Sequence, residues 1–241
     1  MSHLLEIIAY CIEACTIAEN AGADRIELCD NPGDGGTTPS LGMIRMARKN
    51  TGIPLFPIIR PRGGDFLYSD DEYRIMQTDV SFCRDAGCDG VVIGLLRLDG
   101  TIDRDRTARL VELAYPMEVT FHRAFDWVKD PIGALEIVVD CGCSRILTSG
   151  LRPTAVEGAA LIRELHELAA GRIIIMPGSG VRSPNILDLA MRTGVTELHS
   201  SATSSSISSM TYMNQLMITR PSHILPDPDE IGKMKAILAA R

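Results

Sequence analysis

Four stretches of the chain repeat one pattern: Gly22-Ala-Asp-Arg-Ile-Glu-Leu28, Gly87-Cys-Asp-Gly-Val-Val-Ile93, Gly142-Cys-Ser-Arg-Ile-Leu-Thr148 and Gly194-Val-Thr-Glu-Leu-His-Ser200. In each, an amphipathic stretch precedes a glycine suited to the left-handed position after a helix. A short β-rich run follows, so each copy predicts a helix end joined to a strand. The glycines lie 65, 55 and 52 residues apart, which leaves room for two strand–helix units each time.

Further β-rich runs complete the pattern between the copies, at Leu5–Tyr10, Leu55–Arg60, Met117–Arg123 and Arg172–Pro177. Eight strand–helix units in about 200 residues are typical of a closed (β/α)8, or TIM, barrel. An open doubly wound α/β sheet is the alternative, but the fourfold self-similarity favours closure. We therefore expect a single α/β domain with a TIM barrel over residues 1–202.

Residues 203–241 are expected to form a C-terminal extension packed on the same domain and ending in a helix, Asp229–Ala240. The extension begins in a serine-rich stretch, with seven serines in residues 200–209, which predicts a loop. Within the barrel, Ser69-Asp-Asp-Glu72 is a capping box that predicts a helix start. Asp130-Pro131 and Ser183-Pro184 predict two more.

Composition limits the possible partners. The 241 residues include 24 basic and 31 acidic side chains, a net charge of −7, so there is no general electrostatic reason to bind nucleic acid or an anionic membrane. No apolar run approaches the roughly 18 residues of a membrane span, and the first residues lack the features of a signal peptide. Seven cysteines without a CxxC pair indicate packed thiols and a reducing, cytoplasmic location.

Glu27 is the strongest single candidate for a catalytic or ligand-binding residue. Catalytic residues of barrels lie near the carboxyl ends of the strands, and the alternation of the second strand turns Glu27 inward. An inward carboxylate beside apolar layers is costly unless it is paired or protonated. Pairing with Arg25, Arg60 or His199 is one interpretation, and a general acid/base or ligand-binding role is the other.

His122 ends the fifth predicted strand, within Thr120-Phe-His-Arg-Ala-Phe-Asp126. Imidazole is the side chain most readily set near neutral pH for proton transfer. His122 either bonds to neighbouring backbone or exchanges protons together with Glu27. In the second case Arg123 and Asp126 orient the two catalytic groups.

Arg60-Pro-Arg62-Gly-Gly-Asp65 predicts a basic, glycine-rich loop after the third strand. Arginine forks suit carboxylates and phosphates, so Arg60, Arg62 and Asp65 are expected to bind an anionic or hydroxylated ligand. A rigid loop held by Arg–Asp bonds is the alternative. Small or polar residues at the ends of later strands, where barrels often bind phosphate, are expected to supply further donors: Ser149, Gly178, Ser179, Gly180, His199, Ser200 and Ser201.

Metal chemistry has two candidate ligands. Cu(I) needs as few as two soft ligands, and Cys29 lies on the mouth side of its strand, with Cys11 at the start of the first helix. The remaining five cysteines are explained by packing within helices or toward the opposite end of the barrel.

The motifs together resemble one known family, the copper homeostasis protein CutC family. The resemblance runs in order over residues 4–202 and is carried by Glu27-Leu-Cys29, Gly35-Gly-Thr-Thr-Pro-Ser40, Ile59-Arg-Pro-Arg-Gly-Gly-Asp-Phe66, Tyr68-Ser-Asp70, Gly100-Thr-Ile-Asp103, Thr120-Phe-His-Arg-Ala-Phe-Asp126, Leu147-Thr-Ser-Gly150 and His199-Ser-Ser-Ala202.

The resemblance implies a cytoplasmic TIM barrel, usually a homo-oligomer (a dimer or tetramer), with a role in copper handling. The Cu(I) site proposed for the family uses a first-strand cysteine and the cysteine of Glu-Leu-Cys. Cys29 matches the second position, whereas Ile8 occupies the first. Gly178-Ser-Gly180 stands where many members have three glycines.

Three functional hypotheses follow. The first is copper binding or trafficking through Cys29. The second is an enzyme that acts on a small anionic or hydroxylated, sugar-derived substrate by acid/base chemistry at the barrel mouth. The third is a barrel that senses a ligand without turning it over.

Overall fold

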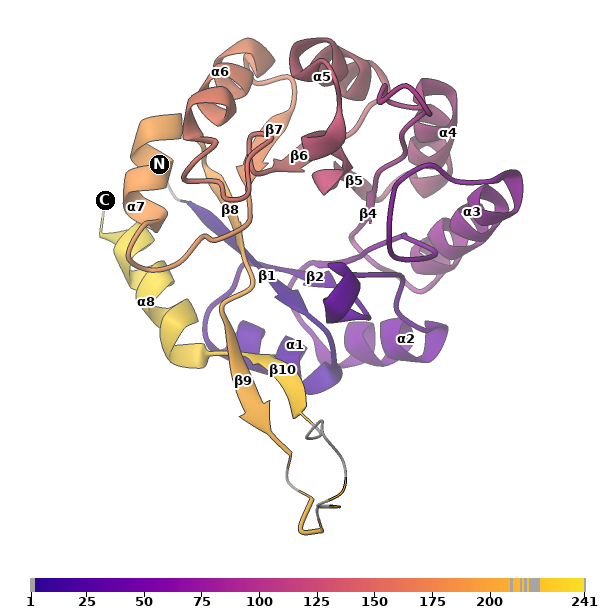
Figure 1. Cartoon of the computed structure of the whole chain (residues 1–241). Coiled ribbons are helices and arrows are strands. Elements are labelled where there is room, and N and C mark those ends of the chain that lie inside the picture. Colours follow the sequence, from indigo (N-terminus) through magenta and orange to yellow (C-terminus); the bar gives the residue numbers. More distant parts are fainter. Residues whose placement is uncertain (1–2, 209, 213, 215, 217–221, 241) are drawn as a thin grey trace.

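The computed structural model describes residues 3–208, 210–212, 214, 216 and 222–240. Strands and helices alternate along the chain, with the strands inside and the helices around them (Figure 1). The strands are β1 Leu4–Ala9, β2 Arg25–Leu28, β3 Leu55–Pro57, β4 Gly90–Ile93, β5 Glu118–Phe121, β6 Arg145–Thr148, β7 Ile174–Pro177 and β8 Glu197–Ser200. The helices are α1 Ile12–Asn20, α2 Leu41–Asn50, α3 Asp70–Asp85, α4 Arg104–Ala114, α5 Pro131–Asp140, α6 Ala159–Ala169 and α7 Ile186–Thr193.

The strands form the predicted TIM barrel. All pairs are parallel, in the orders β3-β2-β1-β8 and β4-β5-β6-β7. An isolated bridge between Ile58 and Val92 joins the two halves at β3 and β4, and β7 lies beside β8. The repeated glycines end helices as expected, because Gly22, Gly87, Gly142 and Gly194 all have φ between 76° and 92°.

Helix starts follow the capping signals in part. Ser69 and Glu72 form the predicted capping box of α3, and Asp130 caps α5 ahead of Pro131. The start predicted at Ser183-Pro184 is wrong, since α7 begins at Ile186. The Ser183 hydroxyl and backbone N–H instead bind the Glu230 carboxylate of the last helix, so this position holds the extension.

Alternate strand residues divide the core. On β1, Leu5 and Ile7 point outward and join the main cluster shared with the helices, whereas Glu6 and Ile8 point into the barrel. The register places Ile8 beside Glu27, and Glu6 beside both Arg25 and His199. The barrel interior therefore contains charged side chains among apolar ones.

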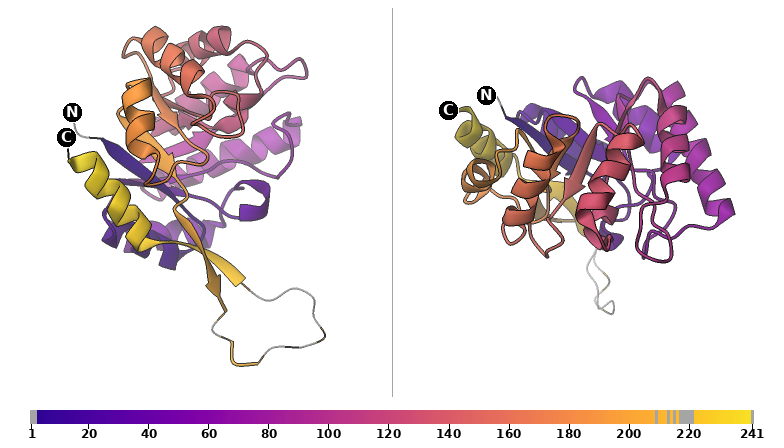
Figure 2. Two further views of the ribbon diagram at one scale, coloured as in Figure 1. Left: turned by 60° about the vertical axis from the view of Figure 1, so that its left-hand side comes forward. Right: turned by 90° about the horizontal axis from the view of Figure 1, so that it is seen from above.

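The extension leaves the barrel as an arm. β9, Thr203–Ile207, pairs antiparallel with β10, Ser222–Pro226, and the two project from the body (Figure 2). The chain then returns in α8, Pro228–Ala239, which packs against α1 and α7 as the terminal helix expected there. The loop predicted over the serine-rich stretch is wrong for 203–207, because pairing with β10 overrides the low β-propensity of serine. None of the described helices has the length and apolar character needed to cross a membrane.

Candidate functional site at the barrel mouth

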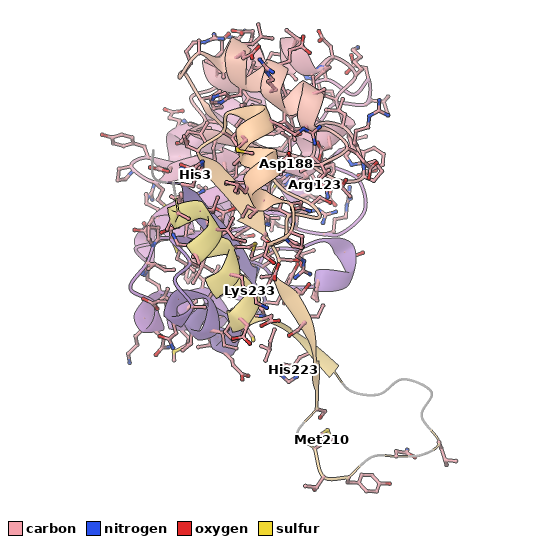
Figure 3. The ribbon with its side chains drawn as sticks, turned by 90° about the vertical axis from the view of Figure 1, so that its left-hand side faces the viewer. His3, Arg123, Asp188, Met210, His223 and Lys233 are labelled. Carbon is pink, nitrogen blue, oxygen red and sulfur yellow. The ribbon has the colours of Figure 1, made fainter. Side chains whose placement is uncertain are left out.

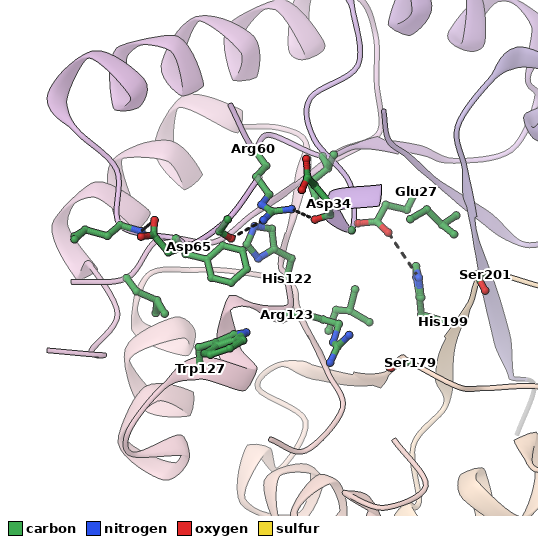
Figure 4. A pocket seen from close by; sticks show the side chains of 18 of the residues that line it. Glu27, Asp34, Arg60, Asp65, His122, Arg123, Trp127, Ser179, His199 and Ser201 are labelled. Carbon is green, nitrogen blue, oxygen red and sulfur yellow. Dashed lines mark hydrogen bonds and ion pairs between the residues drawn. The ribbon is translucent and has the colours of Figure 1, made fainter. Parts of the chain in front are cut away.

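A cavity of about 860 Å³ opens at the carboxyl ends of the barrel strands (Figure 4). Many of the predicted site residues line it: Glu27, Arg60, Asp65, His122, Arg123, Ser179, Gly180, His199 and Ser201. Those that do not line it are Arg62, Asp126, Ser149, Gly178, Ser200, Cys11 and Cys29. The predicted residues thus gather at the barrel mouth, and about half of them line the cavity itself.

Glu27 projects from the end of β2 and is 3% exposed. Burial raises the pKa of its carboxyl to about 7, with His199 lowering it and Glu6 raising it by smaller amounts. The His199 Nε2 atom lies 3.7 Å from a Glu27 carboxyl oxygen. A carboxyl that titrates near neutral pH beside an imidazole is suited to give and take protons.

Glu6 was not predicted, yet it organises this pair. Its carboxylate accepts a hydrogen bond from His199 Nδ1 at 2.8 Å, which turns Nε2 toward Glu27. Burial opposes ionisation of Glu6, but Arg25 and His199 outweigh it and lower the pKa of Glu6 to about 2. The bond to Glu6 and the charge of Glu27 in turn outweigh burial and raise the pKa of His199. The signal for Glu6 was a lone carboxylate in the apolar strand LLEIIA.

Below Glu6, paired charges continue through the barrel interior. Arg25 binds Glu6 and, at 2.6 Å, Glu197. Arg145 binds the same Glu197 at 3.2 Å and Glu118 at 2.6 Å. The two guanidinium groups stack over the Phe56 ring at 5.2 and 5.1 Å. These contacts satisfy the charges that the barrel encloses, which buried ions require.

His122 is held as a neutral hydrogen-bond donor. Its Nδ1 accepts the backbone N–H of Ala124 at 3.0 Å, so the neutral ring carries its proton on Nε2. Burial, and secondarily the charge of Arg60, lower the pKa of His122 to about 3. Nε2 is buried without a partner among the described side chains. The geometry therefore gives His122 a donor role in place of the proton exchange expected from its residue type.

Room for the imidazole comes from Gly94 at the end of β4. A Cβ placed on Gly94 would lie 2.3 Å from Cε1 and Nδ1 of His122. The ring also packs against Phe66, with centroids 5.0 Å apart. His122 is thereby fixed by one backbone bond and by two close neighbours.

The two arginines of the glycine-rich loop make contacts that hold the loop in place. Arg60 donates to the backbone carbonyls of Asp34, Gly36 and Gly64 at 2.6–2.8 Å and is only 5% exposed. Arg62 binds Glu72 at 2.5 Å and Asp65 at 2.9 Å and does not reach the cavity. Both side chains hold the loop rigid, which was the alternative interpretation.

Arg123 is one arginine of the cavity lining that keeps a donor available. Its Nε donates to Asp126 at 2.7 Å and its Nη2 to Ser149 Oγ at 2.9 Å. Asp126 is itself fixed by hydrogen bonds from the backbone N–H groups of Ser149 and Leu151. No described residue accepts from Arg123 Nη1, and the side chain is 43% exposed. Asp126 and Ser149 thus position a guanidinium that faces the cavity.

The two expected copper ligands each have a structural role in the fold. Cys29 is fully buried in a cluster with Ile8, Phe56, Ile58 and Val92, and burial raises the pKa of its thiol well above the usual value. Cu(I) is bound by thiolate, which this apolar surrounding disfavours. The Cys11 sulfur caps α1 by accepting from the Ala14 N–H. Among described residues, the group of three or more side chains spaced to hold a metal is Glu6, Glu27 and His199.

Comparison with known proteins places the chain among relatives. The sequence pattern of the CutC family matches residues 3–204. A family protein CutC of Chromobacterium violaceum is 53% identical, with 88% of this chain and 86% of that protein covered. The copper homeostasis protein cutC homolog of Homo sapiens is 46% identical over 88% of this chain and 77% of that protein.

Solved structures agree with the sequence relatives. The crystal structure of a copper homeostasis protein CutC from Streptococcus agalactiae superposes with a TM-score of 0.79 at 35% identity, covering 83% of this chain and 98% of that one. An aldolase at 14% identity, with a TM-score of 0.62, covers 81% of this chain and 89% of its own and shares the fold alone. The chain belongs to the CutC family.

Proposed function

We propose that this protein is an enzyme that moves a proton on a small anionic or hydroxylated substrate bound in the barrel mouth. One observation carries the proposal. Glu27, a buried carboxyl whose pKa is raised to about 7, shares a cavity with His122, a buried imidazole whose N–H has no partner among described residues. Perturbed and unsatisfied polar groups that meet in a cleft are the pattern of a catalytic site.

The geometry supports a division of labour. Arg123 holds the anionic part of the substrate, and the Glu27 carboxylate takes a proton from a substrate carbon next to a carbonyl group. The electron pair left behind moves onto a substrate oxygen, where the His122 Nε2–H donates a hydrogen bond to the developing charge. His199 shares the proton held by Glu27, and Glu6 keeps His199 oriented.

Solvent exchange tests this function before the substrate is identified. The native chain is incubated in D₂O with a panel of small oxo acids, hydroxy acids and sugar acids, and deuterium incorporation is followed by proton NMR. We expect enzyme-dependent exchange at the carbon beside a carbonyl group in at least one compound. No exchange across the panel, with the protein folded, would contradict the proposal.

Replacing His122 separates donation from proton exchange. His122→Phe is expected to slow exchange about 10²–10³-fold, the usual cost of losing one donor to a developing oxyanion. The pH profile should keep its shape, because an imidazole with a pKa of about 3 is neutral throughout. His122→Gln, which retains an N–H donor, should recover part of the rate. The matched control is His223→Phe on the arm, away from the cavity (Figure 3); equal rates in both Phe variants would refute the donor role.

Copper binding is the function that the names of the relatives suggest, and it can be tested on β1. Ile8→Cys would place a second thiol in the cluster that contains Cys29, completing two soft ligands. We expect the variant to bind Cu(I) at least about tenfold more tightly than the native chain in anaerobic competition with a chelator. Ile7→Cys, on the outward face of the same strand, is the control. If the native chain binds Cu(I) as tightly as the Ile8→Cys variant, and Cys29→Ser loses this binding, then Cys29 binds copper without a second thiol at position 8.

A cytoplasmic location and a homo-oligomeric state are also part of the proposal. Seven free cysteines, six of them buried, support a reducing compartment. The resemblance to the family supports the oligomer. Light scattering of the purified chain and fractionation of its native cells test the two points.

A further inference from the structure

The cavity at the mouth is divided into two chemically different ends. The loops after β7 and β8 contribute Ser179, Gly180 and Ser201, and Arg123 lies on the same side (Figure 4). The loops after β3, β4 and β5 contribute Phe66, Leu67, Leu98 and Trp127. One end is therefore lined by polar backbone and a cation. The other combines apolar and aromatic side chains with charged groups of the same loops, Arg60, Asp65 and Arg97.

The loop after β7 presents its backbone to the cavity. The Ser179 hydroxyl is turned away and donates to the Pro153 carbonyl at 2.8 Å, while the Ser179 carbonyl accepts from Ala155 N–H at 3.0 Å. Ser179 and Gly180 have φ of 79° and 72°, and their N–H groups find no acceptor among described residues. Consecutive backbone N–H groups in such a turn form a concave site for anions. A non-glycine residue in this conformation is strained and persists where its surroundings fix it.

Two side-chain donors accompany this backbone. Arg123 keeps Nη1 without an acceptor among described residues, while Asp126 and Ser149 hold the rest of its guanidinium. His122 is 4% exposed and its Nε2–H is unpartnered in the same described part of the chain. The nearby acidic groups at the mouth are engaged elsewhere, because Asp65 binds Arg62 and Asp34 accepts from Asn31. The unpaired backbone donors of the β7 loop, Arg123 and His122 thus lie on the β5, β7 and β8 side, while Arg60 Nε and Arg97 offer further donors on the β3 and β4 side.

Trp127 marks the other end. It is the single tryptophan of the sequence, and its side chain is 73% exposed at the cavity rim. With Leu98 at 89% exposure beside it in the lining, this is a large apolar surface left open to water. Such surface marks a binding site when it borders a cavity, and an indole ring stacks on flat or cyclic groups.

We propose that the cavity binds a phosphate monoester of a ring-bearing metabolite, with the phosphoryl group at Ser179, Gly180, Ser201 and Arg123 and the ring against Trp127. This assignment rests on the proposed function, since it names the substrate class of the same site. A phosphoryl group offers three terminal oxygens, which two loops and one guanidinium can share, and barrels commonly bind phosphate after strands seven and eight. A phosphate monoester carries a charge of about −1.5 to −2 at neutral pH, more than a carboxylate, so it gains more from a guanidinium and a concave set of backbone N–H groups.

Binding is measured in Glu27→Gln, so that turnover does not interfere. The probes are phenyl phosphate, adenosine 5′-monophosphate and glucose 6-phosphate, each beside its unphosphorylated counterpart, with inorganic phosphate as a fourth. Trp127 fluorescence reports occupancy directly because no other tryptophan contributes. We expect at least one phosphate ester to change the emission and to bind at least about tenfold more tightly than its counterpart and than inorganic phosphate.

Arg123→Met in the same background should weaken that ester about tenfold or more, since one charge-assisted donor is lost. Arg152→Met, which removes an exposed arginine outside the cavity lining, is the matched control and should bind as the parent does. Trp127→Leu, measured by calorimetry, should weaken the ester but not inorganic phosphate. The inference fails if no ester outcompetes its counterpart or if Arg123→Met binds unchanged.

The two proposals fail differently. Ester binding in Glu27→Gln without solvent exchange in the native chain would overturn the enzyme and leave a phosphate-sensing barrel. Exchange on unphosphorylated compounds without ester binding would overturn the phosphate subsite and leave the enzyme.

Discussion

Glu27→Gln should lower the rate of solvent exchange about 10²–10⁴-fold, the range typical for removing a positioned acid/base. The amide has nearly the shape of the carboxyl but cannot accept the proton. The exchange assay on whichever compound the native chain accepts provides the measurement. Glu13→Gln, at an exposed position of α1, is the control and should retain the native rate.

The same substitution should stabilise the folded chain at higher pH. A carboxyl whose pKa rises from 4.5 to about 7 on folding binds its proton more tightly in the folded state. The native chain therefore loses stability as the pH rises from about 4.5 through about 7, whereas glutamine does not titrate. At about 1.4 kcal/mol per pKa unit, the variant should gain roughly 3 kcal/mol well above pH 7 and little below pH 4.5.

Chemical denaturation at several pH values measures this difference. A stability gain that does not change with pH would show that Glu27 does not carry the raised pKa. A gain at high pH combined with lost exchange would show that the site keeps its buried acid at the expense of stability, as active sites commonly do.

Arg25→Met should destabilise the fold by about 3–5 kcal/mol, the range for removing one partner of a buried ion pair. Arg25 is 3% exposed and is shared by Glu6 and Glu197. Without Arg25, Glu6 still contacts His199 and Glu197 still contacts Arg145. Each carboxylate therefore keeps one partner but loses its closest cation. Equilibrium unfolding by denaturant at neutral pH is the measurement.

Glu6→Gln added to Arg25→Met should restore part of the loss, because the uncompensated charge disappears with its partner. Arg172→Met breaks an exposed pair with Glu136 and should cost only about 0.2–1 kcal/mol. If Arg25→Met costs no more than Arg172→Met, the interior charges are not coupled in the way their contacts indicate.

The fold could be predicted from the sequence because its determinants are local and periodic. Each repeated glycine ends a helix, and alternation within the following strand separates Ile26 and Leu28 from Glu27. The arm formed by β9 and β10 could not be found in this way. Its strands depend on pairing between segments that are far apart along the chain, and serine by itself favours turns.

The location of the site could be predicted from the sequence, but the contacts of its side chains could not. Strand ends placed Glu27, His122 and His199 at one mouth, since parallel strands end together. How many donors each arginine keeps available depends on three-dimensional partners that composition does not reveal. Arg60 is used on backbone carbonyls, and Arg123 is left open because Asp126 and Ser149 hold it from behind.

The bare α-carbon of Gly94 has a consequence for how this protein can vary over evolution. Any side chain there meets the imidazole of His122 at 2.3 Å. Even alanine at position 94 would displace the His122 imidazole, although His122 itself is unchanged. Sequence variation at position 94 is therefore coupled to the chemistry of His122. A lineage in which the glycine is lost is one where selection for the imidazole has already relaxed.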